Sequence, residues 1–214
     1  MKKAIFFILV ALASCKQEKV YHDEVSQTFF QEKEKLKFEA DVKAFQSELN
    51  EEYRNPEKSP LPEKLRLKFT GHDFFPISIV YNVKAKFTRT PNEKPFLMPT
   101  TSNRTTEEVL FGIAEFELNG KAHTLQIYQS PKLKQTKGYE DYLFLPFSDE
   151  TNGESTYGGG RYLDLRIPQG NEITINFNKA YNPYCAYNEK YSCPLVPKGN
   201  MLLTKIEAGV KYQK

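Results

Sequence analysis

The first patterned segment of the chain, residues 20–54, has apolar residues at helical spacing. Phe38, Val42, Phe45 and Leu49 follow one another at intervals of four, three and four residues, so they share one stripe of a helix. Glu and Lys fill most of the other positions. The pattern predicts an N-terminal amphipathic helix whose stripe packs on a domain or binds a partner. Three prolines within residues 55–62 end this helix, because proline removes a backbone donor and clashes with the preceding turn.

Beyond residue 62 the period changes from helical to alternating. Over residues 77–87 the odd positions are apolar and most even positions are polar, which is typical of a half-buried strand. Residues 88–106 are rich in Thr, Pro and Asn, and we expect a mobile loop there.

The dipeptide Asn119-Gly120 lies between two alternating segments and predicts a hairpin with a type I′ turn. A two-residue turn pairs Leu118 with Lys121 and places His123 opposite Phe116. His123 could then be a catalytic base or a half-buried histidine beside an aromatic ring. His22 and His72 have no recognisable catalytic neighbours in the sequence.

A second hairpin is expected from the alternation in residues 162–167 and 173–177. Apolar odd positions must oppose apolar odd positions, which requires a five-residue loop and pairs Ile173 with Ile167 or Leu165. Extending this ladder sets Arg161 opposite Lys179 or Phe177. Arg161 has the parity of the buried side chains, and a guanidinium there needs an anionic or multiply accepting partner.

Two interpretations of Arg161 remain open at this point. Asp149, in the loop just before the strand, could form an internal ion pair with it. Alternatively, Arg161 could bind an anion at the mouth of the sheet.

The composition fits a protein dominated by sheets. The chain has 16 Phe and 13 Tyr but no Trp, and aromatic residues that alternate with polar ones suit sheets with one wet face. We therefore expect a mainly β (α+β) fold, an antiparallel sheet sandwich or partly closed barrel built from hairpins, with the N-terminal amphipathic helix.

The N-terminus, MKKAIFFILVALASC, has the features of an export signal. Two lysines precede an uncharged apolar run that is shorter than the roughly 20 residues needed to span a bilayer. The run ends in Leu-Ala-Ser-Cys, which resembles the lipobox of bacterial lipoproteins. That resemblance implies removal of residues 1–14 and acylation of Cys15, which would anchor the protein to a membrane. The alternative is an ordinary secretory signal with a chance cysteine.

Three parts of the chain follow from these boundaries. Residues 1–14 are the signal peptide, residues 15–58 the tether and helix, and residues 59–214 a mainly β domain of ordinary size. The formal charge falls from +3 to +1 when Lys2 and Lys3 leave with the signal. No basic stripe suggests nucleic acid, and no motif indicates a cofactor, a metal or a known catalytic site.

Several short motifs between residues 59 and 211 resemble the uncharacterised bacterial family catalogued as domain of unknown function 1684. They are densest from residue 142 to 200, where they include YLFLPFSD at 142–149, TY at 156–157, GRYLD at 160–164, NFNKAYNP at 176–183, CAYN at 185–188, CP at 193–194 and Asn200. Further matches are SPL at 59–61, FFPI at 74–77 and AG at 208–209. Lys198-Gly199 and Val210 depart from the family pattern. The resemblance implies a shared fold and a shared residue cluster, but it assigns no activity.

The two remaining cysteines, Cys185 and Cys193, form an even pair in a domain expected to be exported, where disulfides persist. We expect them to be joined, which would stabilise the fold by roughly 2.5 kcal/mol. Packed free thiols are a second interpretation. A metal or redox site is a third, although structural zinc needs four ligands.

The functional hypothesis is a lipid-anchored binding or accessory module of the cell envelope, on the periplasmic or cell-surface side. Its polar pocket would take a small polar or anionic ligand and be lined by Asp149, Arg161, Asn178, Tyr181, Asn182 and Tyr187. Two other hypotheses stay open. One is an envelope hydrolase with Asp149 or His123 as base and Arg161 stabilising an oxyanion. The other is a structural envelope protein whose polar cluster satisfies itself.

Overall fold

The computed structural model describes residues 22–212, which form parts of two units, Met1–Leu36 and Lys37–Lys214. The expected signal peptide and the expected acylation site, Cys15, lie outside the described residues. The second unit contains the sheet and the helical residues from Lys37 onward, and all contacts discussed below belong to it. Within the described residues, none of the helices has an apolar stretch of membrane-spanning length.

The long helix α1, His22–Arg54, ends directly before Asn55-Pro56, as the prolines predict. Of the four stripe residues, Val42 and Leu49 are buried, whereas Phe38 and Phe45 are half-buried. A short helix α2 spans Glu63–Arg66. Five 3-10 turns complete the helical elements, at Ile79–Tyr81, Leu133–Gln135, Phe177–Lys179, Tyr184–Ala186 and Lys198–Asn200.

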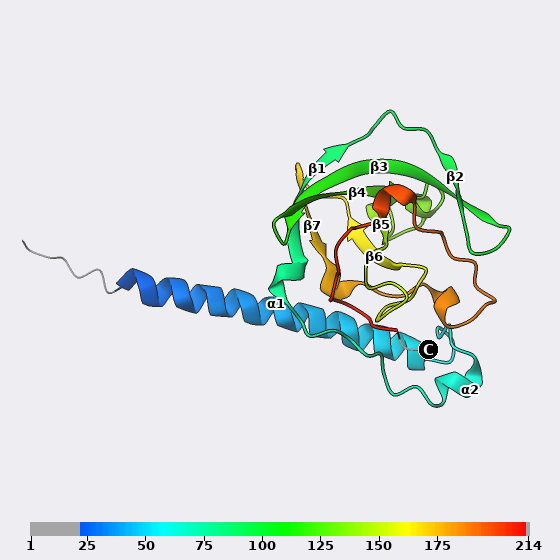
Figure 1. The fold of residues 1–214 in the computed structure, drawn as a ribbon, viewed down its shortest axis with the longest axis horizontal. Coiled ribbons are helices and arrows are strands. Elements are labelled where there is room, and N and C mark those ends of the chain that lie inside the picture. The colour runs from blue at the N-terminus through cyan, green and yellow to red at the C-terminus, as the bar shows by residue number, and fades with distance from the viewer. Residues whose placement is uncertain (1–21, 213–214) are drawn as a thin grey trace, which may run out of the picture. The chain divides into compact units, whose positions relative to one another are not determined.

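Seven antiparallel strands form one curled, half-barrel sheet, so the mainly β expectation is confirmed (Figure 1). The strands are β1 Asn82–Arg89, β2 Phe96–Pro99, β3 Thr105–Leu118, β4 Lys121–Gln129, β5 Tyr142–Phe147, β6 Arg161–Arg166 and β7 Glu172–Asn176. Their order in the sheet is β6-β5-β4-β3-β1-β7, and β2 pairs with β3 to one side of this path. The long strand β3 arches over the other elements (Figure 1).

The hairpin of β3 and β4 has the predicted register. Leu118 pairs with Lys121 and Phe116 with His123, around a turn in which Asn119 has φ +53° and Gly120 has φ +72°. These positive φ values are those of a type I′ turn, which favours Asn-Gly. A register shift between Leu110 and Gly112 bends β3, and a Cβ at Gly112 would lie 2.5 Å from the Phe87 ring.

The predicted hairpin of residues 162–167 and 173–177 is wrong. Strand β6 pairs with β5, so that Arg161 opposes Phe147, and β7 pairs with β1, where Ile175 opposes Val83. The alternation of both segments is real, but pairing depends on which sheet edges the rest of the chain offers.

Two smaller predictions are corrected in the same region of the sheet. Residues 79–81 form a 3-10 turn before β1 begins, and residues 96–99 form β2 within the expected loop.

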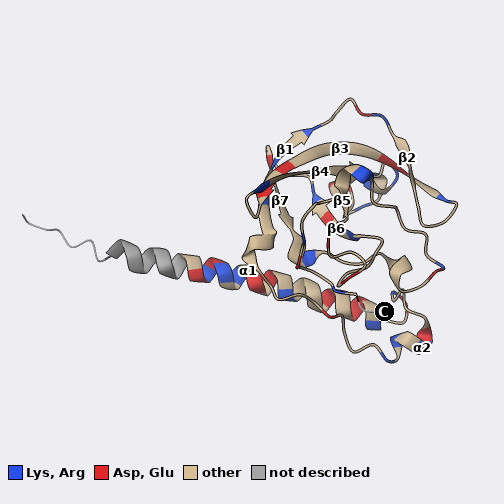
Figure 2. Ribbon diagram, viewed as in Figure 1, with Lys and Arg blue, Asp and Glu red and all other residues tan. Residues whose placement is uncertain are grey.

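The main core lies on the concave side of the sheet and is built by apolar residues of β1, β3, β4, β5, β6 and β7. Val83, Leu145, Leu163, Ile175 and Phe177 belong to this cluster, each no more than 8% exposed. A second apolar cluster lies on the other side of β5 and β6 and is rich in tyrosine. The charged residues are spread over α1 and the strands with both signs interspersed (Figure 2).

Candidate functional site

The strands β5 and β6 carry two different sets of polar residues, one on each face. Because side chains alternate along a strand, Arg161 lies with the core residues Leu163 and Leu165, whereas Tyr162 and Asp164 point to the opposite face. The two faces give two separate candidate sites: a buried ion pair on the concave side and a tyrosine-rich cleft on the other side.

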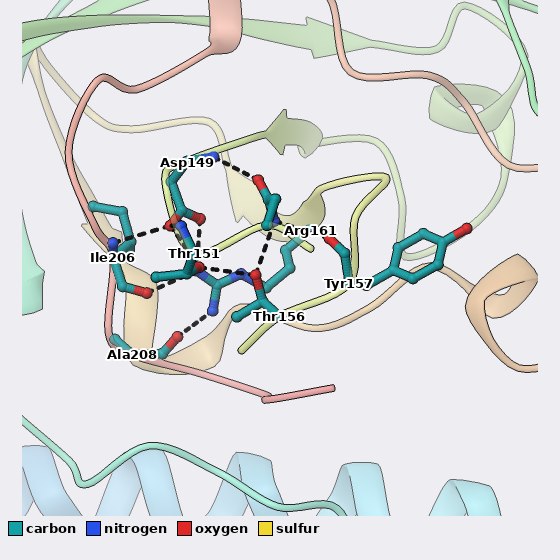
Figure 3. A network of polar contacts seen from close by, with 8 residues as sticks. Asp149, Thr151, Thr156, Tyr157, Arg161, Ile206 and Ala208 are labelled. Carbon is teal, nitrogen blue, oxygen red and sulfur yellow. Dashed lines mark hydrogen bonds and ion pairs between the residues drawn. The ribbon is translucent and has the colours of Figure 1, made fainter. Parts of the chain in front are cut away.

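The buried ion pair joins Arg161 to Asp149 at the base of the loop between β5 and β6 (Figure 3). One guanidinium nitrogen of Arg161 donates to Asp149 Oδ2 at 2.8 Å and to the carbonyl oxygen of Ile206 at 2.8 Å. The other donates to the carbonyl oxygen of Ala208. Asp149 Oδ1 accepts from the backbone N–H and hydroxyl of Thr151 and from the N–H of Ile206.

This cluster is sealed, since the side chains of Arg161 and Asp149 are both 0% exposed. Burial lowers the pKa of Arg161, and the Asp149 carboxylate acts in the opposite direction by favouring the charged form. The internal ion pair is therefore confirmed, and Arg161 has no open face toward an anion. Arg161 has a structural role, because its hydrogen bonds to Ile206 and Ala208 hold the C-terminal segment against the loop between β5 and β6.

The other expected pocket residues are spread over separate contacts. Asn178 is buried and bonds both the N–H and the carbonyl of Ser78 at 2.9 Å. Asn182 donates to the Tyr187 hydroxyl at 2.9 Å, and the Tyr187 ring packs against Tyr53. The structure thus brings together Asp149 with Arg161 and Asn182 with Tyr187, but it does not gather the six residues around one opening.

Tyr181, the sixth expected residue, lines a cleft of about 470 Å³ on the other face of β5 and β6. Helix α1, the strands β3, β5 and β6, and segments that follow β4 and β7 contribute to its walls, and Glu108 lies on β3. The cleft is lined by Phe45, Glu48, Leu49, Glu52, Glu108, Ser130, Leu133, Tyr142, Phe144, Tyr162, Asp164, Tyr181, Pro183, Tyr184, Cys193 and Pro194. Its volume lies in the range of small-molecule sites.

Tyrosine hydroxyls organise the carboxylates of this cleft. Tyr142 and Tyr181 both donate to Asp164 Oδ1, at 2.7 and 2.6 Å, and the Tyr184 hydroxyl donates to Glu52. Burial, together with the nearby Asp164 charge, raises the pKa of Tyr142 and of Tyr181. Both phenols therefore remain protonated donors at neutral pH, and both donate to the same Asp164 oxygen.

Glu108 is the most unusual polar residue of the cleft. It is only 6% exposed, and its Oε2 atom has no hydrogen-bond partner among the described residues. Burial raises the pKa of Glu108 to about 7, because the charged form loses its hydration. The neighbouring Thr106 hydroxyl lowers this pKa, but Thr106 Oγ1 and Glu108 Oε2 both lack a hydrogen-bond partner among the described residues. A buried carboxyl in this state is costly, so it requires either a ligand or a functional explanation.

The two cysteines lie side by side at the edge of the cleft as free thiols, so the structure does not contain the expected disulfide. The backbone N–H of Cys185 donates to Cys193 Sγ at 3.2 Å. Their mutual hydrogen bond lowers the pKa of Cys185 to about 6 and raises that of Cys193. Within residues 22–212 there is no group of three or more His, Cys, Asp or Glu side chains placed to hold a metal ion.

His123 and His72 occupy structural positions. His123 is half-buried with its ring centroid 5.6 Å from that of Phe116, as expected for a histidine packed beside an aromatic ring. The Nδ1 atom of His72 lies 2.9 Å from Asn50 Oδ1, and its ring packs edge-on against Tyr53. Burial lowers the pKa of His72 to about 4, so this ring is neutral at pH 7.

The family model for the protein of unknown function DUF1684 matches residues 67–211, which include every strand described above. The chain belongs to the DUF1684 family. This confirms the family resemblance seen in the motifs of residues 142–200. No curated protein matches the chain.

A solved structure has a fold similar to that of this chain. The solution NMR structure of an uncharacterised protein of Haloarcula marismortui is 31% identical in sequence, with a TM-score of 0.67. The match covers 84% of this chain and 97% of that chain. The relationship supports the fold but names no ligand or reaction.

Sequence reasoning missed most of the cleft in this DUF1684 protein. The even positions of β5 and β6, Tyr142, Phe144, Tyr162 and Asp164, belong by alternation to the face away from the core. That face was expected to be wet, but helix α1 and residues 181–194 border a cleft on it instead. The sequence did contain one indication of the cleft: the polar face of these strands carries more aromatic residues than a face exposed to water usually does.

Proposed function

We propose that this DUF1684 protein is a membrane-anchored module of the cell envelope that binds a small ligand in the cleft between α1, β5 and β6. The observation that carries the proposal is the cleft itself, about 470 Å³ in volume, with six aromatic and four carboxylate side chains among those that line it. Concave, largely aromatic surfaces with a few placed polar groups are the usual form of small-molecule sites.

The position of the cleft differs from the pocket expected around Arg161. Of the six residues expected there, Tyr181 alone lines the cleft, whereas Arg161 and Asp149 form a closed cluster on the other face of the sheet. That closed cluster supports a purely structural role for Arg161. It gives no support to a hydrolase that uses Asp149 as base, because the Asp149 carboxylate is 0% exposed.

The anchor is part of the proposal and rests on the sequence. The charged start, the short apolar run and the Leu-Ala-Ser-Cys motif support acylation of Cys15. Acyl chains at Cys15 would tether the protein to a membrane.

Native mass spectrometry of the full chain, extracted from its own membrane, tests the binding function. We expect a small molecule to co-purify with the wild type and to be lost from Leu133→Trp, which places an indole at the rim of the cleft. Leu203→Trp is the matched control, since Leu203 is 70% exposed and does not line the cleft. Equal occupancy in both variants would refute binding at this site.

A further inference from the structure

We infer that the ligand of this cleft is an organic cation, an ammonium group on a small apolar body, and that Glu108 is its counter-ion. The inference rests on the proposed binding function and specifies the charge and chemical class of the ligand. The charge of this ligand is opposite to that of the anion expected from Arg161, because the open cleft is lined by carboxylates.

The first support is the segregation of charge in the cleft. Its walls carry four carboxylates, on Glu48, Glu52, Glu108 and Asp164, and no Lys, Arg or His stands among the described residues that line it. The whole chain has 30 basic and 27 acidic residues, so an all-acidic lining is not a consequence of composition. Apolar walls raise the strength of this negative potential, because field lines are less screened than in bulk water.

The second and independent support is the unpartnered state of Glu108. It lines the cleft while it is 94% buried by residue area, and its Oε2 atom has no donor among the described residues. Its neighbour on the strand, Glu107, is exposed to water. Glu108 therefore differs from the adjacent carboxylate in being buried against the cleft. The positive charge of a bound cation would stabilise the Glu108 carboxylate and offset the cost of its burial.

A second carboxylate in the cleft is also available. Both tyrosine hydroxyls that contact Asp164 donate to Oδ1, at 2.7 and 2.6 Å. The Oδ2 atom makes no hydrogen bond with the described residues and can accept from a ligand. Tyr142 and Tyr181 therefore orient the Asp164 side chain and leave one of its two oxygens free to accept a hydrogen bond.

The aromatic walls indicate an organic ammonium rather than a metal ion. Tyr142, Phe144 and Tyr162 line the same cleft as Glu108, and the Phe144 and Tyr162 rings meet edge to face with centroids 4.8 Å apart. Aromatic faces attract alkylammonium groups through cation–π interaction. Divalent metals instead require six or more oxygen ligands at about 2.0–2.6 Å, which aromatic rings cannot supply.

Calorimetric titration of the full chain in a non-ionic detergent tests the charge preference. The probes are two matched pairs, each a cation and its neutral isostere: choline with 3,3-dimethylbutan-1-ol, and benzyl(2-hydroxyethyl)dimethylammonium with 3,3-dimethyl-4-phenylbutan-1-ol. We expect at least one cation to bind tenfold or more tightly than its neutral partner. Glu108→Gln should reduce that ratio to about threefold or less, whereas Glu107→Gln, which changes an exposed carboxylate on the same strand, should leave it unchanged.

Several results would overturn the inference. The first is equal binding of cation and isostere, and the second is binding of neither cation. The third is tighter binding of benzoate than of either cation, and the fourth is displacement of bound choline by Mg²⁺ or Ca²⁺. If Glu108→Gln keeps the wild-type preference for the cation over its isostere, Glu108 is not the counter-ion. If the ligand that co-purifies is neutral or anionic and is lost from Leu133→Trp, the binding function stands and this inference alone fails.

Discussion

Removing the guanidinium of Arg161 should destabilise the fold strongly, because its ion pair is buried. Removing one charge of an exposed ion pair with the same N–O distance should have a much smaller effect. In Arg161→Met the Asp149 carboxylate stays buried and keeps its contacts to Thr151 and Ile206, but it loses its counter-charge. Breaking a buried pair in this way costs about 3–5 kcal/mol of unfolding free energy.

The double variant should recover part of that loss. In Arg161→Met with Asp149→Asn no charge remains buried, and the amide oxygen can still accept from Thr151. The carbonyl oxygens of Ile206 and Ala208 nevertheless lose their donor, at about 1–3 kcal/mol for each unsatisfied group. We therefore expect incomplete recovery and a coupling free energy of about 2 kcal/mol between the two positions, in the range known for networked residues.

Urea unfolding followed by circular dichroism measures the four corners of this cycle. For a chain of this size a change of 1 kcal/mol shifts Tm by about 2–4 °C, so Arg161→Met should lower Tm by about 6–20 °C. The matched control is the exposed pair of Lys205 and Glu154, whose N–O distance is also 2.8 Å and whose side chains are 51% and 65% exposed. Lys205→Met should leave the free energy of unfolding nearly unchanged, because exposed ion pairs contribute little to stability.

Two outcomes would refute this reasoning. One is Arg161→Met costing no more than Lys205→Met, which would mean that burial does not set the energy of the pair. The other is a cycle without coupling, which would mean that Arg161 acts through the carbonyls of Ile206 and Ala208 alone.

Three further predictions address the anchor, the thiols and Glu108. Cys15→Ala should abolish incorporation of labelled palmitate, and a wild type that never takes up the label would contradict the lipoprotein hypothesis. If the protein is exported as proposed, non-reducing mass mapping should find Cys185 joined to Cys193, a bond that these adjacent thiols could form on oxidation. Two fully alkylatable thiols would contradict this prediction. The pKa of Glu108 is raised from 4.5 to about 7 in the folded state, so the fold binds more protons than the unfolded chain between these values. Stability should therefore fall as pH rises from 4.5 through 7, and Glu108→Gln should raise Tm relative to the wild type at pH 8 but not at pH 4.5. The other carboxylates of the cleft, Asp164, Glu48 and Glu52, are unchanged in this comparison. Equal pH profiles of Tm for the two proteins would show that Glu108 is not the titrating group.

Local patterns determined much of the fold. The Asn119-Gly120 turn fixes its own register, because only residues that accept positive φ fit a two-residue loop, and the flanking strands then pair residue by residue. Alternation likewise placed Arg161 among the buried side chains before its partners were known, and the prolines after Arg54 ended the helix where they occur. These features depend on residues close in sequence.

The tertiary structure decided which strands pair and where a cleft opens. A hairpin of β6 and β7 was locally acceptable, but β6 pairs with β5 across residues 148–160, and β7 closes against β1. Periodicity tells which face of a strand is apolar and carries no information about the neighbouring strand. The partners of Arg161 at Ile206 and Ala208 lie 45 and 47 residues away and could not be read from the strand itself.

The cleft is the clearest case of a feature that alternation alone could not predict. The sequence by itself places Tyr162 and Asp164 on the face of β6 away from the main core. Whether that face meets water or another element depends on α1 and residues 181–194, which are distant in sequence and reach it only when the chain is folded. The sequence thus determined the residue types on each face, and the tertiary structure decided that one face seals an ion pair while the other borders an acidic, aromatic cleft.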